Sequence, residues 1–280
     1  MQIESSDFDF IRQLVRRHSA IVVEEGGEKL AGLRLAGIVT ASGLSSVSEL
    51  VSTLRNQAFG TLHRAVVEAM ATSETRFFRD MHPFDALRKT LIPQLIERRR
   101  DERTLSIWCG ACSTGQEPYS VAMLLREHFS QLSAWKITIL GTDLVHRVLE
   151  KAESGIYTSL EVNRGLPATY LIKYFASQGI NWHLLPEIRQ MVEFREMNLA
   201  GAWPPMPRMD IILLRNVLAS LEPEVKAKIL EKTHGVLRQD GYLFLGNAET
   251  TLGIDCAYER YPAGEAVAYR PLSAAVCDGG

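Results

Sequence analysis

The sequence contains few cysteines and no long apolar segment. Only four of its 280 residues are cysteine (Cys109, Cys112, Cys256 and Cys277), too few for the disulfide framework of a small secreted protein. No apolar run reaches the roughly 18 residues that a membrane-spanning helix needs. The first residues, MQIESSD, are acidic and lack the basic-then-apolar form of a signal peptide. We therefore expect a cytoplasmic protein that does not insert into a membrane.

An excess of charge of one sign is also missing. The chain has 31 Lys and Arg against 33 Asp and Glu, a net charge of −2, so no global charge favours nucleic acid as a partner. Cys109-x-x-Cys112 could be half of a zinc or redox site, but no second Cys or His pair lies at ligand spacing. We favour two small side chains that fit a strand end and a turn, and we expect no metal.

The chain is organised around one stretch, T-L-S-I-W-C-G-A-C-S-T-G-Q-E-P-Y-S, from Thr104 to Ser120. It predicts a buried strand, a glycine turn from Gly110 to Gly115 and a helix, the first βα unit of a nucleotide-binding sheet. The turn lacks the Lys-Ser/Thr of a phosphate loop, because Gln116-Glu117 stands there. The Glu117 carboxylate suits a ligand without a charged phosphate. It also suits a cationic ligand, such as a sulfonium with an amino-acid tail.

Polar residues follow three further predicted strands. Asp143 ends the run 136–142, and we favour hydrogen bonding to ribose hydroxyls over helix capping for it. Asn198-Leu199 ends the run 191–198, where the amide could read an adenine edge or form a turn. Arg215-Asn216 follows the apolar run 210–214, and a charge there requires a ligand or a buried acid as its partner.

Two domains are predicted. Residues 1–72 form a helical N-terminal domain, with a capping box at Ser46 and Glu49. Residues 73–280 form an α/β domain that an insertion at about 155–200 interrupts, and its last strand, 266–269, returns antiparallel. Between the two, Phe77-Phe78 either packs between the domains or lines a pocket, since loops are usually polar.

Five ordered motifs resemble the CheR-type chemotaxis receptor methyltransferases. They are T-S-E-T-R-F-F-R-D, W-C-G-A-C-S-T-G-Q-E-P-Y-S-V-A-M, G-T-D-x4-V-L-x-x-A-x-x-G-x-Y, L-L-R-N-V-L and L-F-L-G-N-A-E. The resemblance covers about residues 5 to 270. It implies a class I (Rossmann-like) methyltransferase sheet with a small α-helical N-terminal domain and a small β-subdomain insertion.

The resemblance also implies a function in chemotaxis signal transduction. Such enzymes transfer a methyl group from S-adenosyl-L-methionine to glutamates on the cytoplasmic helical domain of chemoreceptors, leaving glutamate methyl esters and S-adenosyl-L-homocysteine. Carried over by position, the cofactor contacts are Ser73, Thr75, Arg79, Glu117, Asp143, Asn198, Leu199, Arg215 and Asn216. Arg79 and Arg215 are interpreted as catalytic clamps on the cofactor carboxylate or on the incoming glutamate.

The chain departs from the family pattern at three places. Ser73 stands where the family usually has Asn, and Ser220-Leu221 stands where it has Tyr-Phe. The connection 176–180 has a single glycine and is shorter than the loop with which some relatives bind a receptor tail pentapeptide. We therefore expect no pentapeptide tether, recognition through arginines such as Arg55 and Arg64, and action as a monomer.

Two other functions fit part of the sequence. A nicotinamide-dependent dehydrogenase shares the glycine turn and the acidic second-strand end, but its G-x-G-x-x-G fingerprint is absent here. A non-catalytic scaffold or sensor could retain the fold and the cofactor, since fold does not determine function. Ser73 and Ser220 are the residues that favour this second alternative.

Overall fold

A seven-stranded, mostly parallel sheet forms the centre of the molecule. The computed structural model describes residues 3–71, 74–254 and 257–272. The strand order is β6-β2-β1-β7-β8-β10-β9. The strands are β1 (Thr104–Gly110), β2 (Lys136–Asp143), β6 (Val192–Glu196), β7 (Met209–Leu214), β8 (Leu237–Leu245), β9 (Tyr258–Ala263) and β10 (Ala266–Pro271). The first five in this order pair in parallel and β10 is antiparallel to β8 and β9, which confirms the predicted sheet.

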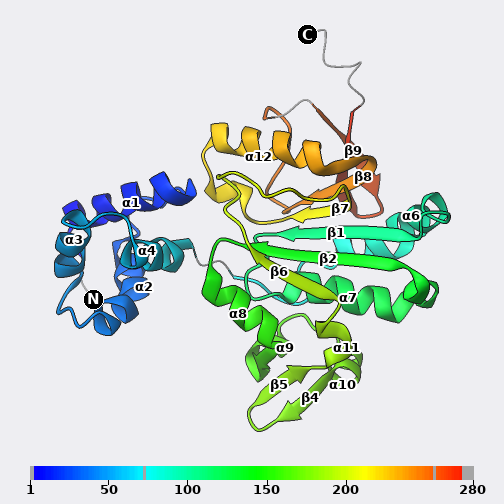
Figure 1. Ribbon diagram of the computed structural model, residues 1–280, viewed down its shortest axis with the longest axis horizontal. Helices are drawn as coiled ribbons and strands as arrows, with labels where there is room; N and C mark the ends of the chain where they lie inside the picture. The colour runs from blue at the N-terminus through cyan, green and yellow to red at the C-terminus, as the bar shows by residue number, and fades with distance from the viewer. Residues whose placement is uncertain (1–2, 72–73, 255–256, 273–280) are drawn as a thin grey trace.

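Helices cover both faces of this sheet (Figure 1). One face carries α6 (Ile92–Arg98), α7 (Gln116–His128) and α8 (His146–Ser154), and the other carries α12 (Pro223–Val236). Every residue of β7 is buried, as expected for a strand covered on both sides. Upstream of α6, α5 (His82–Ala86) continues into a π-helical turn, η1 (Leu87–Leu91). Among the described residues, none of the helices has the length and apolar character needed to cross a membrane.

Four helices make up the N-terminal part: α1 (Ser5–Ser19), α2 (Glu28–Ala41), α3 (Val47–Arg55) and α4 (Thr61–Ala71), here called the helical unit. They enclose a separate apolar core that includes Phe8, Leu35 and Leu50. Half of the predicted capping box is present: Glu49 N–H donates to Ser46 Oγ at 3.1 Å, whereas the Glu49 carboxylate accepts from Ser45. The division of the chain at residue 72 stays a prediction.

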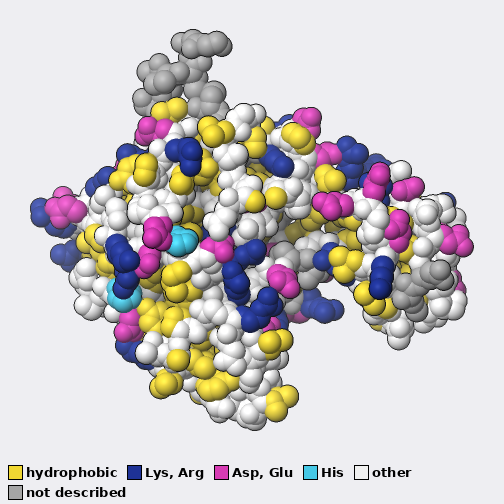
Figure 2. Space-filling view, turned by 180° about the vertical axis from the view of Figure 1, so that it is seen from behind, with side chains coloured by type: hydrophobic (Ala, Val, Ile, Leu, Met, Phe, Trp, Pro, Cys, Tyr) yellow, Lys and Arg dark blue, Asp and Glu magenta, His cyan; other side chains and the backbone are white. Residues whose placement is uncertain are grey.

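A second sheet of three strands, in the order β3-β5-β4, lies beside the main one. It contains β3 (Ile156–Thr158), β4 (Phe175–Gln178) and β5 (Asn181–Leu184), with α9 (Ser159–Asn163), α10 (Ala168–Tyr174) and α11 (Pro186–Arg189) around them. Figure 2 shows this small sheet and the helical unit as two lobes that project from the main body. The predicted insertion at about 155–200 extends too far at its C-terminal end, because it includes β6, which pairs with β2 in the main sheet.

The sequence interpretation also missed β9, which it treated as part of a loop. This strand carries Glu259, Arg260 and Pro262 and lies at the edge of the sheet, where proline and charged side chains are tolerated. Its pattern therefore resembles that of a loop. A turn containing Gly264 then leads into β10.

Candidate functional site

Two hollows lie at the carboxyl ends of β1, β2 and β7. We call the first the Asp143 pocket; it spans about 590 Å³ when the open solvent at its mouth is included. The second, the Glu117 pocket, spans about 360 Å³ on the same basis. Ala111, after β1, and Asn216, after β7, line both pockets. The two hollows therefore adjoin at the edge of a parallel sheet where ligands bind in this class of fold.

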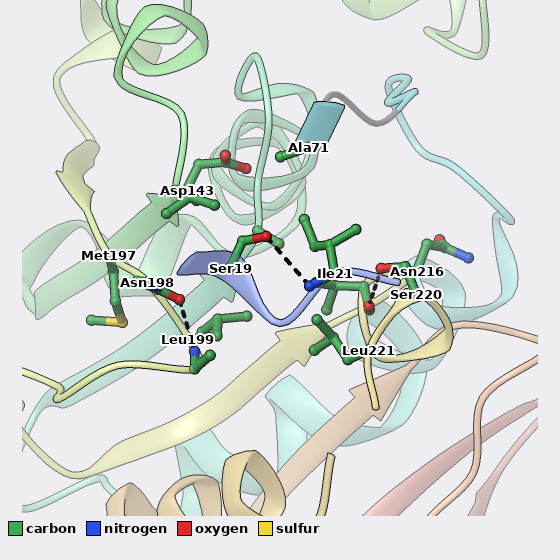
Figure 3. Close-up of a pocket in the computed structure, with 14 residues that line it drawn as sticks. Ser19, Ile21, Ala71, Asp143, Met197, Asn198, Leu199, Asn216, Ser220 and Leu221 are labelled. Carbon is green, nitrogen blue, oxygen red and sulfur yellow. Dashed lines mark hydrogen bonds between the residues drawn. The ribbon is translucent and has the colours of Figure 1, made fainter. Parts of the chain in front are cut away.

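The structure brings the described site residues of the prediction together. Thr75, Arg79, Glu117 and Arg215 line the Glu117 pocket. Asp143, Asn198 and Leu199 line the Asp143 pocket (Figure 3), and Asn216 lines both. Ser73 lies outside the described residues. Residues that are up to about 140 positions apart in the chain thus meet around one pair of adjoining hollows.

The backbone around these pockets is unusual. Of the seven described non-glycine residues with positive φ, five lie here: Phe78 (47°), Asp80 (55°), Ala111 (53°), Ser113 (51°) and Asn216 (59°). Such conformations cost free energy and concentrate at functional sites. The turn between β1 and α7 ends at Gly115, whose φ is 88° and where an added Cβ would lie 2.8 Å from the Cβ of Ala152. Glycine is required there both by conformation and by space.

The Asp143 carboxylate stabilises the turn between β1 and α7. Its Oδ2 accepts from the Ser113 N–H at 2.8 Å and its Oδ1 from the Val145 N–H at 3.0 Å. Burial raises the pKa of this carboxyl group, and the backbone N–H donors oppose the shift. The carboxylate thus holds the glycine turn and the residue before α8 while it lines the pocket. The helix-capping alternative is wrong, because the N-cap of α8 is Val145 and this helix has no side-chain cap hydrogen bond.

Arg215 has the buried acid that the sequence required. Its Nη1 donates to Glu117 Oε2 at 2.7 Å, and its Nη2 donates to Asp80 Oδ2 at 2.9 Å and to the Arg79 carbonyl at 3.0 Å. The Arg215 side chain is only 1% exposed. Burial raises the pKa of Glu117, and the neighbouring Arg215 guanidinium opposes that shift. Both terminal nitrogens of Arg215 are therefore engaged by the protein itself.

Arg79 differs from Arg215 in its exposure. Its Nη1 donates to the Glu74 carbonyl at 2.9 Å, and its side chain is 33% exposed at the Glu117 pocket. The guanidinium of Arg79 thus has donors left for a ligand. Of the two arginines predicted as clamps, Arg79 is the one whose charge an incoming carboxylate can reach.

Two aromatic residues anchor the segment that carries Arg79. The Phe78 N–H donates to Ser120 Oγ on α7 at 2.9 Å. The Phe77 ring, fully buried, packs edge-on against Tyr157 and Phe175 of the small sheet. The structure matches neither interpretation that the sequence left open for this pair: both rings are buried in the core of the C-terminal part, and neither lines the Asp143 pocket or the Glu117 pocket. The anchoring fixes Arg79 and Asp80 beside α7.

Sequence reasoning missed several residues at the site. Glu249, which follows β8, accepts from Asn216 N–H at 2.8 Å, Gly246 N–H at 2.7 Å and Ala219 N–H at 2.9 Å, so it holds the loop after β7. It lies in the L-F-L-G-N-A-E motif, which was the available signal. Ser19, Ile21 and Ala71, from the helical unit, also line the Asp143 pocket. No pattern in the sequence indicated them.

Asn198 connects the pocket to the helical unit. Its Nδ2 donates to the His18 carbonyl at 2.9 Å, and its Oδ1 accepts from the Ala200 N–H at 3.0 Å. The second bond is the turn-forming interaction that the sequence left as an alternative. The oxygen of this amide is thus engaged inside the chain, and one N–H remains for a ligand.

Cys109 and Cys112 are both buried and free. Burial raises the pKa of both thiols, which lowers their reactivity. In the ranges 3–71, 74–254 and 257–272, no group of three or more His, Cys, Asp or Glu residues is arranged to hold a metal ion.

Comparisons with known proteins agree with this geometry. Residues 73–264 match the family described as CheR methyltransferase, SAM binding domain. The chain is 36% identical over 275 residues to chemotaxis protein methyltransferase 1 of Pseudomonas aeruginosa, covering 96% of this chain and 99% of the relative. It is also 36% identical to chemotaxis protein methyltransferase Cher2 of Pseudomonas putida, with the same coverage of both chains.

A third relative is chemotaxis protein methyltransferase 1 of Vibrio cholerae, 32% identical over 94% of this chain and 95% of that protein. Among solved structures, PKMT2 from Rickettsia typhi aligns with a TM-score of 0.38 and 15% identity, over 62% of this chain and 26% of that chain. The family match and the near-full-length identities agree with the five motifs and the strand-end pockets. The chain belongs to the CheR family of S-adenosylmethionine-dependent methyltransferases.

Proposed function

We propose that this chain transfers the methyl group of S-adenosylmethionine to glutamate side chains of chemoreceptors in the cytoplasm, giving glutamate methyl esters. The names of its relatives, chemotaxis protein methyltransferases, support a role in that signalling system. One structural observation carries the proposal: two adjoining pockets of different chemistry share Ala111 and Asn216 at the end of the parallel strands.

The residues of these pockets fit the cofactor. The Asp143 pocket combines a carboxylate with apolar side chains such as Met197 and Leu199, which suits a ribose and a base. The Glu117 pocket presents charges of both signs, which suits the zwitterionic amino-acid end. In addition, Arg215 Nε is buried and has no hydrogen-bond acceptor among the described residues. A ligand in the Glu117 pocket can supply a missing acceptor there.

We assign a role to each end of the site. Asp143 would hold the ribose hydroxyls, and Leu199 would cover the base. Glu117 and Arg79 would hold the amino and carboxylate groups, with Arg215 as the buried charge that keeps Glu117 ionised and oriented. When bound, S-adenosylmethionine supplies an electrophilic methyl group on a sulfonium sulfur.

Methyl transfer to a glutamate side chain needs no general base. A glutamate side chain has an ordinary pKa of about 4.3 and is ionised at neutral pH. No proton has to be removed, and the site needs only to align the carboxylate and exclude water, effects that can contribute roughly 7–11 kcal/mol. The product is a neutral ester.

Two measurements test the proposal. Calorimetric titration with S-adenosylhomocysteine should show saturable binding. Incubation with tritiated S-adenosylmethionine and receptor-containing membranes should then transfer label that mild alkali releases as methanol, as expected for a carboxylate ester. Arg79→Ala should reduce the transfer, whereas Arg100→Ala, at an exposed arginine that lines neither pocket, serves as the control.

The outcomes separate the alternatives. Cofactor binding with no transfer to any receptor membrane would contradict the proposal and support the scaffold function. Label that resists alkali would show that the acceptor is not a carboxylate. Binding of a nicotinamide dinucleotide in place of S-adenosylhomocysteine would contradict both assignments.

A further inference from the structure

The segment that carries Arg79 has an unusual backbone. Phe78 and Asp80, the two residues that flank Arg79, both have left-handed conformations, with φ values of 47° and 55°. Such conformations are uncommon for residues other than glycine and persist only where the surrounding structure holds them. The Ser120 hydroxyl holds the first of the two, because it accepts the Phe78 N–H at 2.9 Å and donates to the Gln116 carbonyl at 2.6 Å. The support for Asp80 must come from another part of the chain.

Arg215 supplies that support from the end of β7. One nitrogen of this side chain, Nη2, donates both to Asp80 Oδ2 at 2.9 Å and to the Arg79 carbonyl at 3.0 Å. The other terminal nitrogen, Nη1, donates to Glu117 Oε2 at 2.7 Å. Asp80 and Glu117 therefore hold the buried guanidinium of Arg215 from two sides, and this guanidinium in turn stabilises the backbone at residues 79–80.

The Asp80 carboxylate also lies beside two further arginines. Its Oδ1 accepts from Arg76 Nη2 at 3.3 Å, and its Oδ2 lies 4.0 Å from Arg79 Nε. Like Arg215, both of these arginines line the Glu117 pocket. Asp80 itself is 18% exposed and lines neither the Glu117 pocket nor the Asp143 pocket. Since guanidinium groups repel one another, a carboxylate placed among three of them offsets that repulsion from behind the pocket.

We propose that Asp80 is a positioning residue for the amino-acid end of the cofactor. It directs Arg79 into the Glu117 pocket, and it keeps Arg215 bonded to the protein. The two arginines then have different roles, one facing the ligand and one fixed within the chain, although both line the same pocket. Asp80 touches no ligand and acts only through these neighbours. The assignment rests on the proposed function, in which the amino-acid end of S-adenosylmethionine lies in the Glu117 pocket.

This role predicts which part of a ligand depends on Asp80. S-adenosylhomocysteine carries the amino-acid end, whereas 5′-methylthioadenosine has the same adenosine and lacks that end. Under the proposed function the adenosine lies in the Asp143 pocket, and none of the three arginines beside Asp80 lines that pocket. Loss of the Asp80 carboxylate should therefore weaken binding of the first ligand and spare the second. General damage to the fold would weaken both.

Titration of the full chain with both ligands provides the first test. Asp80→Asn removes the charge and keeps a residue that tolerates a left-handed backbone. By calorimetry, we expect the dissociation constant of S-adenosylhomocysteine to rise at least fivefold and that of 5′-methylthioadenosine to stay within twofold. Asp85→Asn is the matched control and should leave both constants within twofold, because Asp85 pairs with Arg88 and Lys89 and lines neither pocket. An unchanged constant for S-adenosylhomocysteine in Asp80→Asn, or an equal rise for both ligands, would overturn the assignment.

A second variant covers the case in which Asp80→Asn does not fold. Asp80→Gly also removes the carboxylate, and glycine adopts a φ near 55° readily, so the same selective loss is expected. Failure of the wild-type chain to bind S-adenosylhomocysteine would contradict the proposed function and this assignment together. Wild-type binding with no selective loss in the variant would contradict this assignment alone.

The action through Arg79 is tested by combining two substitutions. If Asp80 directs Arg79, then Asp80→Asn should raise the dissociation constant of S-adenosylhomocysteine by a smaller factor in a chain that already carries Arg79→Ala than in the wild-type chain. Equal factors in the two chains would show that the residues act independently and would overturn the role of Asp80 in positioning Arg79.

Discussion

Single side chains at this site both support the protein's own structure and face a cavity. Asp143 accepts two backbone N–H groups and still lines a pocket. Glu117 neutralises the buried Arg215 and lines the other pocket. Substitution of either residue must therefore change binding and stability together. A loss of activity alone would not separate the two roles, so both quantities have to be measured.

For Asp143 we predict that substitution by asparagine weakens cofactor binding. The change removes the negative charge and replaces one acceptor oxygen by a donor that faces a backbone N–H. Hydrogen bonds to charged groups contribute about 1.5–3 kcal/mol each, so the dissociation constant of S-adenosylhomocysteine should rise at least tenfold by calorimetry. Asp101→Asn, at an exposed turn, is the control and should bind like the wild type. An unchanged constant for Asp143→Asn would remove this residue from the site.

For Glu117 we predict a loss of stability as well as of affinity. Glu117→Gln leaves Arg215 with Asp80 as its only acidic partner, and breaking a buried ion pair costs about 3 kcal/mol or more. Urea unfolding should show this loss, and titration should show weaker binding. Glu127→Gln, on the same helix, breaks a partly exposed pair with Lys173 and should cost less than about 1 kcal/mol. Equal stability of the two variants would mean that the Glu117 pair is not important for folding.

At the scale of helices and strands, much of the sheet was predictable, because buried strands are short apolar runs and each site residue stands where such a run ends. β1, β2 and β7 and the residues after them were found in this way. Pairing was less predictable: the run 191–198 does not reveal which sheet β6 joins, and the charged edge strand β9 resembles a loop. Contacts between distant segments, such as Ile21 with Leu221, leave no periodic pattern in a single sequence.

The ion pair between α1 and the start of α12 gives a prediction at this scale. Arg16→Glu places two acidic side chains together at positions 16 and 222 and should weaken the docking of the helical unit. Since surface pairs contribute up to about 1 kcal/mol, we expect the dissociation constant of S-adenosylhomocysteine to rise roughly twofold to fivefold. Arg16→Glu combined with Glu222→Arg should restore it.

Arg17 provides the matched control for that experiment. It is exposed, lies next to Arg16 on α1 and has no ion pair within the part of the chain that the structure describes. Arg17→Glu therefore makes the same change of charge without touching α12 and should leave the affinity unchanged. If both single variants lose affinity equally, general charge and not the pair is responsible.

The small sheet gives a further prediction at this scale. Its edge strand β4 has four residues, and only Gly179 and Ile180 separate it from β5. So short a turn leaves little freedom to admit a peptide backbone as an added strand. We predict that a fluorescent receptor-tail pentapeptide gives a flat titration curve with this chain. Saturable binding in the low-micromolar range would contradict that prediction.

For the whole molecule, the tryptophans provide a natural probe. All four, Trp108, Trp135, Trp182 and Trp203, lie in the C-terminal part, and the helical unit contains none. Fluorescence therefore follows unfolding of the C-terminal part, whereas far-ultraviolet circular dichroism also includes the helical unit. With S-adenosylhomocysteine at 100 times its dissociation constant, stability should rise by about 2.7 kcal/mol. We predict that both signals shift together; a shift in fluorescence alone would show that the helical unit unfolds independently of the bound cofactor.

The bridge between Ile21 and Leu221 also determines how this chain can be recombined with its relatives. A chimera joined at residue 72 would combine the pocket wall of one protein with the loop after β7 of another. Residues 19–22 and 218–222 should therefore be exchanged as one block, even though about 200 positions separate them. In evolution the same constraint predicts that substitutions in these two segments arise in pairs, because the two segments form one contact surface.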